Sequence, residues 1–152
     1  MKTKNFDHMN CSLAQTLSVI GEHWSLLVVR DAFMGLRRFD EFQKDLGIAR
    51  NILSDRLKRL VSEGILEKSK GDNSYFEYRL TEKGYELQPI LLSMIHWGDR
   101  HKPNPAGERL IFVDRENGKP IEQMAVHAKD GRVLRSRDLR ATAGPGYRSR
   151  AQ

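Results

Sequence analysis

The stretch from Ile48 to Leu66, IARNILSDRLKRLVSEGIL, constrains the fold of this chain more than any other segment. Drawn as a helix over residues 49–63, its apolar side chains fall within one arc, namely Ile52, Leu53, Leu57, Leu60 and Val61. The opposite side carries Asn51, Ser54, Asp55, Lys58 and Ser62. The pattern predicts an amphipathic helix that ends at Gly64 and shows amide, hydroxyl and charged groups to solvent.

A two-stranded hairpin is predicted directly after this helix. Residues 65–68 and 75–80 read as strands, and they flank the polar turn 69–74. A helix followed by a ribbon with Lys70 and Asn73 at its tip is the layout of a winged helix. In that layout the helix enters the major groove of DNA and the ribbon lies on the adjacent backbone. The alternative for the polar face is an ordinary solvated helix surface.

Shorter helices are predicted before this unit. Phe39, Phe42 and Leu46 are spaced for a helix over 39–46, and Gly47 supplies the turn into the next helix, so the pair forms a helix-turn-helix unit. Ser12 is expected to cap a first helix that ends at Gly21. A second helix over 24–34 is apolar on several faces and is therefore placed in the core.

The last long helix is predicted to begin after Thr81 and to kink at Pro89. Its apolar positions cover an arc of roughly 220°, whereas a helix with one buried face needs about 100°. These positions are Leu87, Ile90, Leu91, Leu92, Met94, Ile95 and Trp97. A helix with two apolar faces at the edge of a small domain needs a second partner, and a second copy of the chain is the natural one.

Beyond residue 98 the composition changes. Residues 99–107 contain Pro103 and Pro105 and are predicted to form a linker. Residues 108–140 are expected to form a small β appendage, because Asn-Gly and Asp-Gly turns at 117–118 and 130–131 separate short apolar runs. The Gly- and Arg-rich end, 141–152, is expected to be disordered. The predicted fold class is α+β, mainly α: a winged helix-turn-helix over 1–98 with a C-terminal β-hairpin appendage.

Charge and composition limit the function. The chain of 152 residues carries a net charge of +6, which favours a polyanionic partner. Residues 37–83 hold 11 Lys and Arg against 9 Asp and Glu, whereas residues 99–152 hold 12 against 7. The surplus therefore lies mainly outside the candidate reading helix. A single cysteine and the lack of a long apolar run predict a cytoplasmic protein with no membrane partner.

Enzyme function is not expected. The five histidines are scattered without metal-ligand spacing, and neither a Gly-rich phosphate loop nor a G-x-S-x-G motif occurs. No cofactor is therefore predicted.

From Cys11 to Gly98 the order and spacing of residues resemble the HxlR-type winged-helix transcription regulators, relatives of the MarR type. The matching pieces are Cys11 before Leu13-Ala14; Ile20-Gly21-x-x-Trp24; Leu26-Leu27; Arg30; Gly35-x-Arg37-Arg38-Phe39-x-Glu41; Gly47-Ile48; Leu53-Ser54-x-Arg56-Leu57-x-x-Leu60-x-x-x-Gly64-Ile65-Leu66; and Tyr78-x-Leu80-Thr81-x-Lys83-Gly84. The resemblance implies a homodimeric DNA-binding regulator, commonly a repressor of a neighbouring operon. It also implies a dimer built by the first and last helices.

Candidate site residues follow from the pattern and the resemblance together. The expected DNA contacts are Arg37, Arg38, Arg50, Asn51, Ser54, Lys58, Lys70 and Asn73. Asn51 suits an adenine edge, and Arg50 suits guanine or phosphate. Asp55 is expected to pair with Arg59, and Arg56 to form a structural ion pair. The expected dimer interface comprises Leu13, Leu17, Leu87, Leu91, Met94 and Ile95.

Two departures from the family and one cysteine leave alternatives open. The wing is short and lacks prolines and extra basic residues, so a protein-interaction module without DNA binding stays possible. Residues 114–146 resemble a zinc-ribbon-like tail but have no cysteine at their turns, so no metal is predicted.

Cys11 is a candidate redox sensor or a small apolar residue in the dimer interface. A carrier that holds a small molecule at that interface is a third reading, and any effector is unidentified.

Overall fold

The structure, a computed structural model, describes Phe6 and residues 8–147. The chain divides into two compact units, residues 1–88 and residues 89–152, and each is described by itself. This division comes earlier than the boundary expected at residue 98. Residues 148–152, the last part of the C-terminal segment 141–152 that was expected to be disordered, lie outside the described residues.

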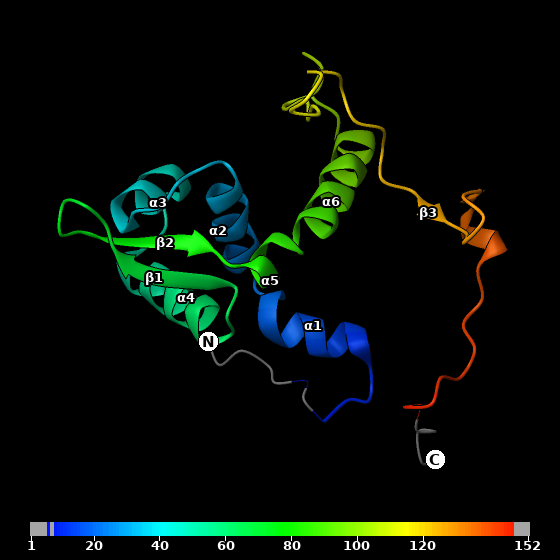
Figure 1. The fold of residues 1–152 in the computed structure, drawn as a ribbon, viewed down its shortest axis with the longest axis horizontal. Coiled ribbons are helices and arrows are strands. Elements are labelled where there is room, and N and C mark those ends of the chain that lie inside the picture. The colour runs from blue at the N-terminus through cyan, green and yellow to red at the C-terminus, as the bar shows by residue number, and fades with distance from the viewer. Residues whose placement is uncertain (1–5, 7, 148–152) are drawn as a thin grey trace. The chain divides into compact units, whose positions relative to one another are not determined.

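The first unit begins with helices whose positions follow the apolar spacing of the sequence (Figure 1). They are α1 (Ser12–Ile20), α2 (His23–Phe33), α3 (Phe39–Leu46) and α4 (Arg50–Ser62). Ser12 was expected to be the N-cap of α1, but it is the first residue of the helix. Cys11 occupies the N-cap position and makes no side-chain hydrogen bond there. Gly47 ends α3 with a φ of 60°, which lets the chain turn sharply into α4.

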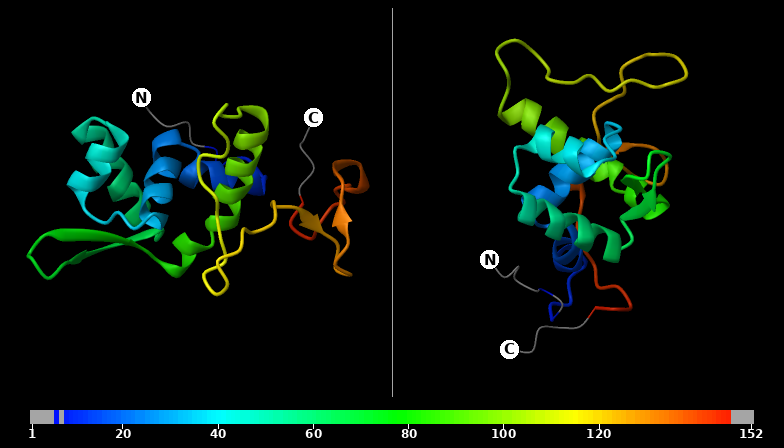
Figure 2. Two further views of the ribbon diagram at one scale, coloured as in Figure 1. Left: turned by 90° about the horizontal axis from the view of Figure 1, so that it is seen from above. Right: turned by 90° about the vertical axis from the view of Figure 1, so that its left-hand side faces the viewer.

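A β-hairpin follows α4. Strand β1 (Leu66–Lys70) pairs antiparallel with β2 (Phe76–Leu80), with Leu66 opposite Leu80 and Lys70 opposite Phe76. Arg38, just before α3, forms an isolated antiparallel β-bridge with Glu77 of β2, so this part of the chain lies along the edge of β2. Figure 2 shows the hairpin extending beside α3 to its turn. The α+β winged helix-turn-helix predicted from the sequence is therefore confirmed.

The core of this unit lies where α2, α3, α4 and the hairpin meet. The side chains with at most 2% exposure include Val28, Val29, Phe42, Leu53, Leu57, Leu60, Ile65 and Leu66. Arg30 adds ion pairs at the edge of this core. It pairs with Asp31 on its own helix and with Asp45 on α3, the latter at 3.2 Å. Asp31 is 2% exposed, and its burial raises the pKa of its carboxyl group.

The predicted single kinked helix after Thr81 is wrong, because two helices replace it. Helix α5 (Glu82–Tyr85) is capped by Thr81, whose hydroxyl accepts a hydrogen bond from the Gly84 N–H at 3.1 Å. Helix α6 (Gln88–His101) starts anew, with Pro89 in its first turn. Proline lacks the N–H needed inside a helix but is tolerated in a first turn, so it begins a helix here and does not bend one.

The second unit carries α6 and the C-terminal appendage. Val113 and Pro120 form a bridge across the turn at Gly118, and β3 (Val126–His127) pairs antiparallel with β4 (Val133–Leu134) across the turn at Gly131. A short 3-10 helix, η1 (Ser136–Asp138), follows. Both predicted turns therefore form. Within the described part of the chain, no helix has the length and apolar character that crossing a membrane requires.

Candidate nucleic-acid interface

Helix α4 has an inner side that is packed and an outer side that is open. Leu53, Leu57 and Leu60 are at most 1% exposed and face the core. Asn51 and Lys58 are exposed, Ser54 is half-buried, and all three have side chains without a hydrogen bond or ion pair to the described residues. At 13 residues, α4 is about 20 Å long, which suits a helix that lies across a DNA groove.

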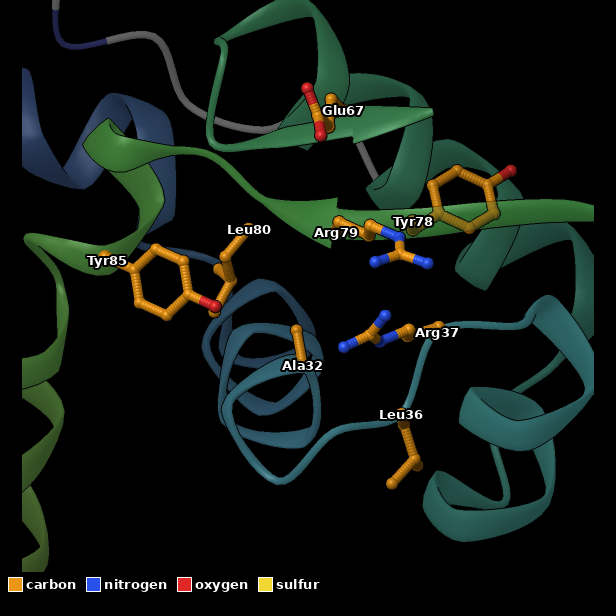
Figure 3. Close-up of a pocket in the computed structure, with 8 residues that line it drawn as sticks. All are labelled: Ala32, Leu36, Arg37, Glu67, Tyr78, Arg79, Leu80 and Tyr85. Atoms are coloured by element: carbon orange, nitrogen blue, oxygen red, sulfur yellow. The ribbon is translucent and has the colours of Figure 1, made fainter. Parts of the chain in front are cut away.

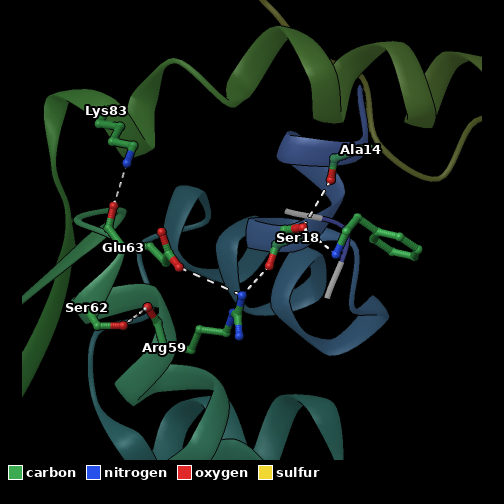
Figure 4. Close-up of polar contacts among 7 residues, drawn as sticks. Ala14, Ser18, Arg59, Ser62, Glu63 and Lys83 are labelled. Atoms are coloured by element: carbon green, nitrogen blue, oxygen red, sulfur yellow. Dashed lines mark hydrogen bonds and ion pairs between the residues drawn. The ribbon is translucent and has the colours of Figure 1, made fainter. Parts of the chain in front are cut away.

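Two arginines on the inner side fix the position of α4. Arg56 pairs with Glu22, the N-cap of α2, at 3.0 Å, so the expected structural ion pair is confirmed. Arg59 donates a hydrogen bond to the Ser18 carbonyl of α1 and lies 3.8 Å from Glu63 (Figure 4). The predicted pair of Asp55 with Arg59 is therefore wrong, because Arg59 reaches across to another helix.

The C-terminal end of α4 is held by residues that follow the hairpin. The Lys83 ammonium group donates to the Glu63 carbonyl at 2.6 Å (Figure 4). The Thr81 hydroxyl donates to the Gly64 carbonyl at 2.6 Å. Carbonyls at a helix end lack partners within the helix, so these side chains satisfy them. The orientation of α4 is thus defined at its end as well as along its inner side.

The N-terminal end of α4 is different. Its N-cap is Ala49, which has no side-chain oxygen and makes no cap hydrogen bond. The first N–H groups of the helix are consequently available to an anion such as a DNA phosphate. Arg50 lies beside them, and its guanidinium group sits 5.0 Å from the centre of the Phe39 ring on α3.

The loop before α3 is ordered by one carboxylate. Glu41 accepts backbone hydrogen bonds from Arg37 at 2.8 Å and from Arg38 at 2.9 Å. These bonds favour the charged carboxylate and lower the pKa of Glu41, with the bond from Arg37 as the larger cause. The Arg38 side chain pairs with Asp40 at 3.0 Å and lies 4.6 Å from the centre of the Tyr75 ring.

The wing adds cations beside aromatic rings. Lys68 lies 4.2 Å from the centre of the Phe76 ring, and Phe76 is itself 50% exposed. Lys70 and Asn73 are exposed near the turn, as expected for residues that reach a DNA backbone. Tyr78 is 9% exposed and packs in the core, so its ring is not presented to a ligand on the wing surface.

The predicted DNA contacts thus separate into groups. Arg50, Asn51, Ser54 and Lys58 share α4, Lys70 and Asn73 belong to the wing, and Arg38 lies beside the wing through Tyr75. Arg37 differs, because its guanidinium group points toward Arg79 (Figure 3). Sequence reasoning missed Arg79, the exposed ring of Phe76 and the part that Glu41 plays in ordering the loop. The spacing of Glu41 three residues after Arg38 is the signal that could have identified its capping role.

The residues expected at a dimer interface differ in exposure. Leu13 is 66% exposed, Leu17 is 41% exposed and Met94 is 52% exposed, whereas Leu91 is buried. Leu87 and Ile95 are half-buried. Ile90 and Trp97, which share α6 with Met94, are also exposed. Cys11 is an exposed free thiol at the start of α1.

Among the described residues, no group of three or more His, Cys, Asp and Glu side chains is arranged to hold a metal ion.

Comparison with known proteins places these features in a family. The sequence profile of the HxlR-like helix-turn-helix matches residues 19–105. An uncharacterised HTH-type transcriptional regulator of Mycobacterium tuberculosis, Rv3095, is 33% identical over 91% of this chain and 89% of its own length. YdeP of Bacillus subtilis, also an uncharacterised HTH-type transcriptional regulator, is 32% identical over 63% of this chain and 77% of its own.

Solved structures are similar as well. The crystal structure of PA1607, a candidate transcription factor, has a TM-score of 0.85 at 41% identity and covers 93% of this chain and 100% of its own. The redox regulator HypR in its oxidised form has a TM-score of 0.56 at 33% identity, over 60% of this chain and 97% of its own.

Proposed function

Because this chain belongs to the HxlR-like helix-turn-helix family of transcription regulators, we propose that it binds a specific double-stranded DNA sequence as a homodimer and represses transcription. It is a regulator by family and not an enzyme. Its proposed site of action is the cytoplasm. Each protomer presents one α4 to one major groove, so the operator is a pseudo-palindrome with half-sites about one helical turn apart.

The division of α4 into a fixed inner side and an open outer side supports this proposal most directly. Arg56 and Arg59 hold the helix to α2 and α1, while Asn51 and Lys58 remain exposed. A helix that reads base edges needs this combination, since its polar side chains must be free of internal partners and its axis must be fixed.

Phosphate contacts are assigned to the cations around α4. Arg38, Lys58 and Lys70 are the proposed backbone contacts, with Asn73 at the wing turn and Arg37 before α3. Arg50 and Asn51 are the proposed base contacts, with Ser54 one turn later on the same helix. The uncapped start of α4 adds backbone N–H groups to the phosphate contacts.

A selection of bound fragments from a random DNA pool tests the proposal. We expect one enriched pseudo-palindromic motif, followed by anisotropy titrations that show tight binding to it and weak binding to random DNA. Recovery of no preferred sequence would reject the regulator function. The alternative, a winged-helix module that binds another protein, would then take its place.

The dimer is proposed to use apolar side chains of α1 and of α6. Leu13 and Leu17 on α1 and Met94 on α6 are exposed, and exposed leucine and methionine side chains in groups are typical of a protein interface. Leu91 and Ile95 on α6, with Leu87 just before that helix, complete the set. An isologous contact uses the same residues on both copies.

A redox-responsive form of this function is a second candidate, favoured by the exposed thiol of Cys11. Hydrogen peroxide converts a thiol to a sulfenic acid and releases water. If Cys11 is a sensor, peroxide changes the DNA affinity of the native protein and leaves that of Cys11→Ser unchanged. An equal response of both proteins, or no response of either, would reject sensing and leave Cys11 a packing residue.

A further inference from the structure

After α6 the chain turns back, and residues 108–124 return along the C-terminal half of this helix (Figure 2). Side chains from three positions of α6 make polar contacts with this returning segment. The three links are His96 with Met124, Arg100 with Gln123, and Asp99 with Arg109. All of them lie within the second unit, and none involves a proposed DNA contact.

The attachment of this segment to α6 is polar and incompletely packed. A cavity of about 140 Å³ remains between the two parts, and its walls include His96 and Asp99 of the helix and Phe112, Ile121 and Gln123 of the segment. Ile111, also in the wall, is 61% exposed, and Ile121 is 37% exposed. Little apolar surface therefore holds the segment, so each hydrogen bond contributes a large share of the attachment.

The link at His96 exists in only one protonation state. The Met124 N–H donates to Nδ1 of His96 at 2.9 Å, so this nitrogen carries a lone pair. The ring is therefore neutral, with its hydrogen on Nε2. A protonated ring carries a hydrogen on both nitrogens, and its Nδ1–H would then face the Met124 N–H. Two donors that face each other repel, so protonation breaks this link.

His127 has the opposite arrangement in the same unit. Its Nδ1 lies 3.2 Å from the Gly131 carbonyl oxygen, across the turn between β3 and β4. A carbonyl oxygen only accepts, so this nitrogen donates, and it keeps its hydrogen when the ring becomes charged. Acid therefore removes the contact of His96 and leaves that of His127 in place.

The charged groups near His96 are balanced in number. Asp99 and Glu108, which share the cavity wall with His96, favour a charged ring, whereas Arg100 and Arg109 disfavour it. Asp99 is already paired with Arg109 at 3.2 Å, and Glu108 has no ion pair with the described residues. With two carboxylates against two guanidinium groups, the hydrogen bond from Met124 decides which form of the ring the attached segment requires.

We propose that His96 is a pH-sensitive latch, which holds residues 108–124 against α6 while its ring is neutral and releases them when the ring is protonated. Histidine side chains take up a proton within about pH 5–8. The attached state accepts only the neutral ring, so a falling pH favours the released state. Release frees the segment that leads into the appendage, and this change is independent of DNA binding.

Limited proteolysis of the full chain tests the latch. Proteinase K acts at both pH 7.5 and pH 5.5, and a free peptide of residues 108–124 corrects for the pH dependence of the protease itself. Relative to that peptide, cleavage within 108–124 should rise at least fivefold at pH 5.5. Nitrogen-15 NMR of labelled histidines should show the His96 ring with hydrogen on Nε2 alone at pH 7.5 and on both nitrogens at pH 5.5.

Two substitutions hold position 96 in one state each. The side-chain oxygen of His96→Asn takes the place of Nδ1 and accepts at both pH values, so cleavage should stay slow at both. His96→Lys is charged and only donates, so cleavage should be fast at both. His127→Gln is the matched control and should respond to pH as the native protein does. Circular dichroism at both pH values establishes that the variants fold.

Equal pH responses of the native protein and His96→Asn would overturn the latch, as would slow cleavage of a folded His96→Lys at pH 7.5. No change in the cleavage of the native protein between the two pH values would overturn it as well. Loss of the response in His127→Gln would assign the pH effect to the β3–β4 hairpin and reject the proposal. If His96→Lys does not fold, the comparison of the native protein with His96→Asn remains decisive.

Discussion

Asn51 and Lys58 lie on the same outer face of α4, but their side chains suit different parts of DNA. An amide can pair with an adenine edge, whereas an ammonium group neutralises phosphate. We predict that Asn51→Ala costs about 1–3 kcal/mol on the selected operator and little on random DNA. Anisotropy titration of both DNAs measures this difference. Equal losses on both would show that Asn51 does not read a base.

Lys58→Gln is the matched variant on that face. It should weaken binding to operator and random DNA alike, and it should reduce the slope of log K against log salt by about 0.9. Titrations over a salt series measure the slope. An unchanged slope would remove Lys58 from the set of phosphate contacts.

Glu41 gives a prediction of pH dependence. Backbone hydrogen bonds from Arg37 and Arg38 lower the pKa of Glu41 from its usual value of 4.5. An acid with a lowered folded-state pKa stabilises the fold above its unfolded pKa and loses that contribution as pH falls through the folded value. Glu41→Gln should therefore be less stable at neutral pH and lose less stability on acidification below 4.5. Urea unfolding across this range measures both effects.

The control for Glu41 is Glu86→Gln, an exposed glutamate with no side-chain hydrogen bond or ion pair to the described residues. The free energy of unfolding of Glu86→Gln should change with falling pH in the same way as that of the native protein. Parallel pH profiles for native protein and Glu41→Gln would show that the two backbone bonds contribute nothing measurable.

At the level of residues, the helix wheel predicts which side chains turn toward the core but not the partners that they find there. Arg56 was expected to form a structural ion pair because it lies near the apolar arc, and it pairs with Glu22. Arg59 was assigned to its neighbour Asp55, yet it reaches Ser18, 41 residues earlier. Helical spacing describes only neighbours on the same helix, so a contact between helices lies outside what it can predict.

At the scale of elements, the junction of α5 with the hairpin depends on Gly84. A Cβ at this position would lie against the Ile65 carbonyl oxygen and 2.9 Å from Leu80 Cδ2. We predict that Gly84→Ala destabilises the protein by about 1–3 kcal/mol, the usual cost of overpacking. Gly98→Ala is the control, because a Cβ there meets nothing within 4 Å and alanine favours a helix by up to about 1 kcal/mol. Denaturant unfolding compares the two.

The elements themselves were largely predictable. Helices α3 and α4 and the hairpin follow from apolar spacing and glycine positions, and α3 has the predicted bounds, 39–46. The break between α5 and α6 was not predicted, because the apolar pattern continues through it. Periodicity detects which faces are apolar, whereas the break here falls just before Pro89, which lacks the N–H that a continuous helix would need.

At the scale of the whole molecule, dimerisation is the central prediction. Sedimentation at micromolar concentration should give twice the chain mass of 17.5 kDa. Met94→Glu should shift the protein to the monomer, since a carboxylate in an apolar contact is costly, and Met94 is exposed enough for the variant to fold. Ser93→Glu, at an exposed polar position of α6, is the control and should remain dimeric. A native monomer would contradict the proposal.

The two sides of α4 have a consequence for how such a protein can change. Arg56 and Arg59 carry the attachments of the helix, while Asn51, Ser54 and Lys58 carry none among the described residues. Substitutions at these outer positions therefore leave the folding free energy nearly untouched. Target preference and stability become separately adjustable, so exchanging a few outer side chains offers a route to retarget the same scaffold.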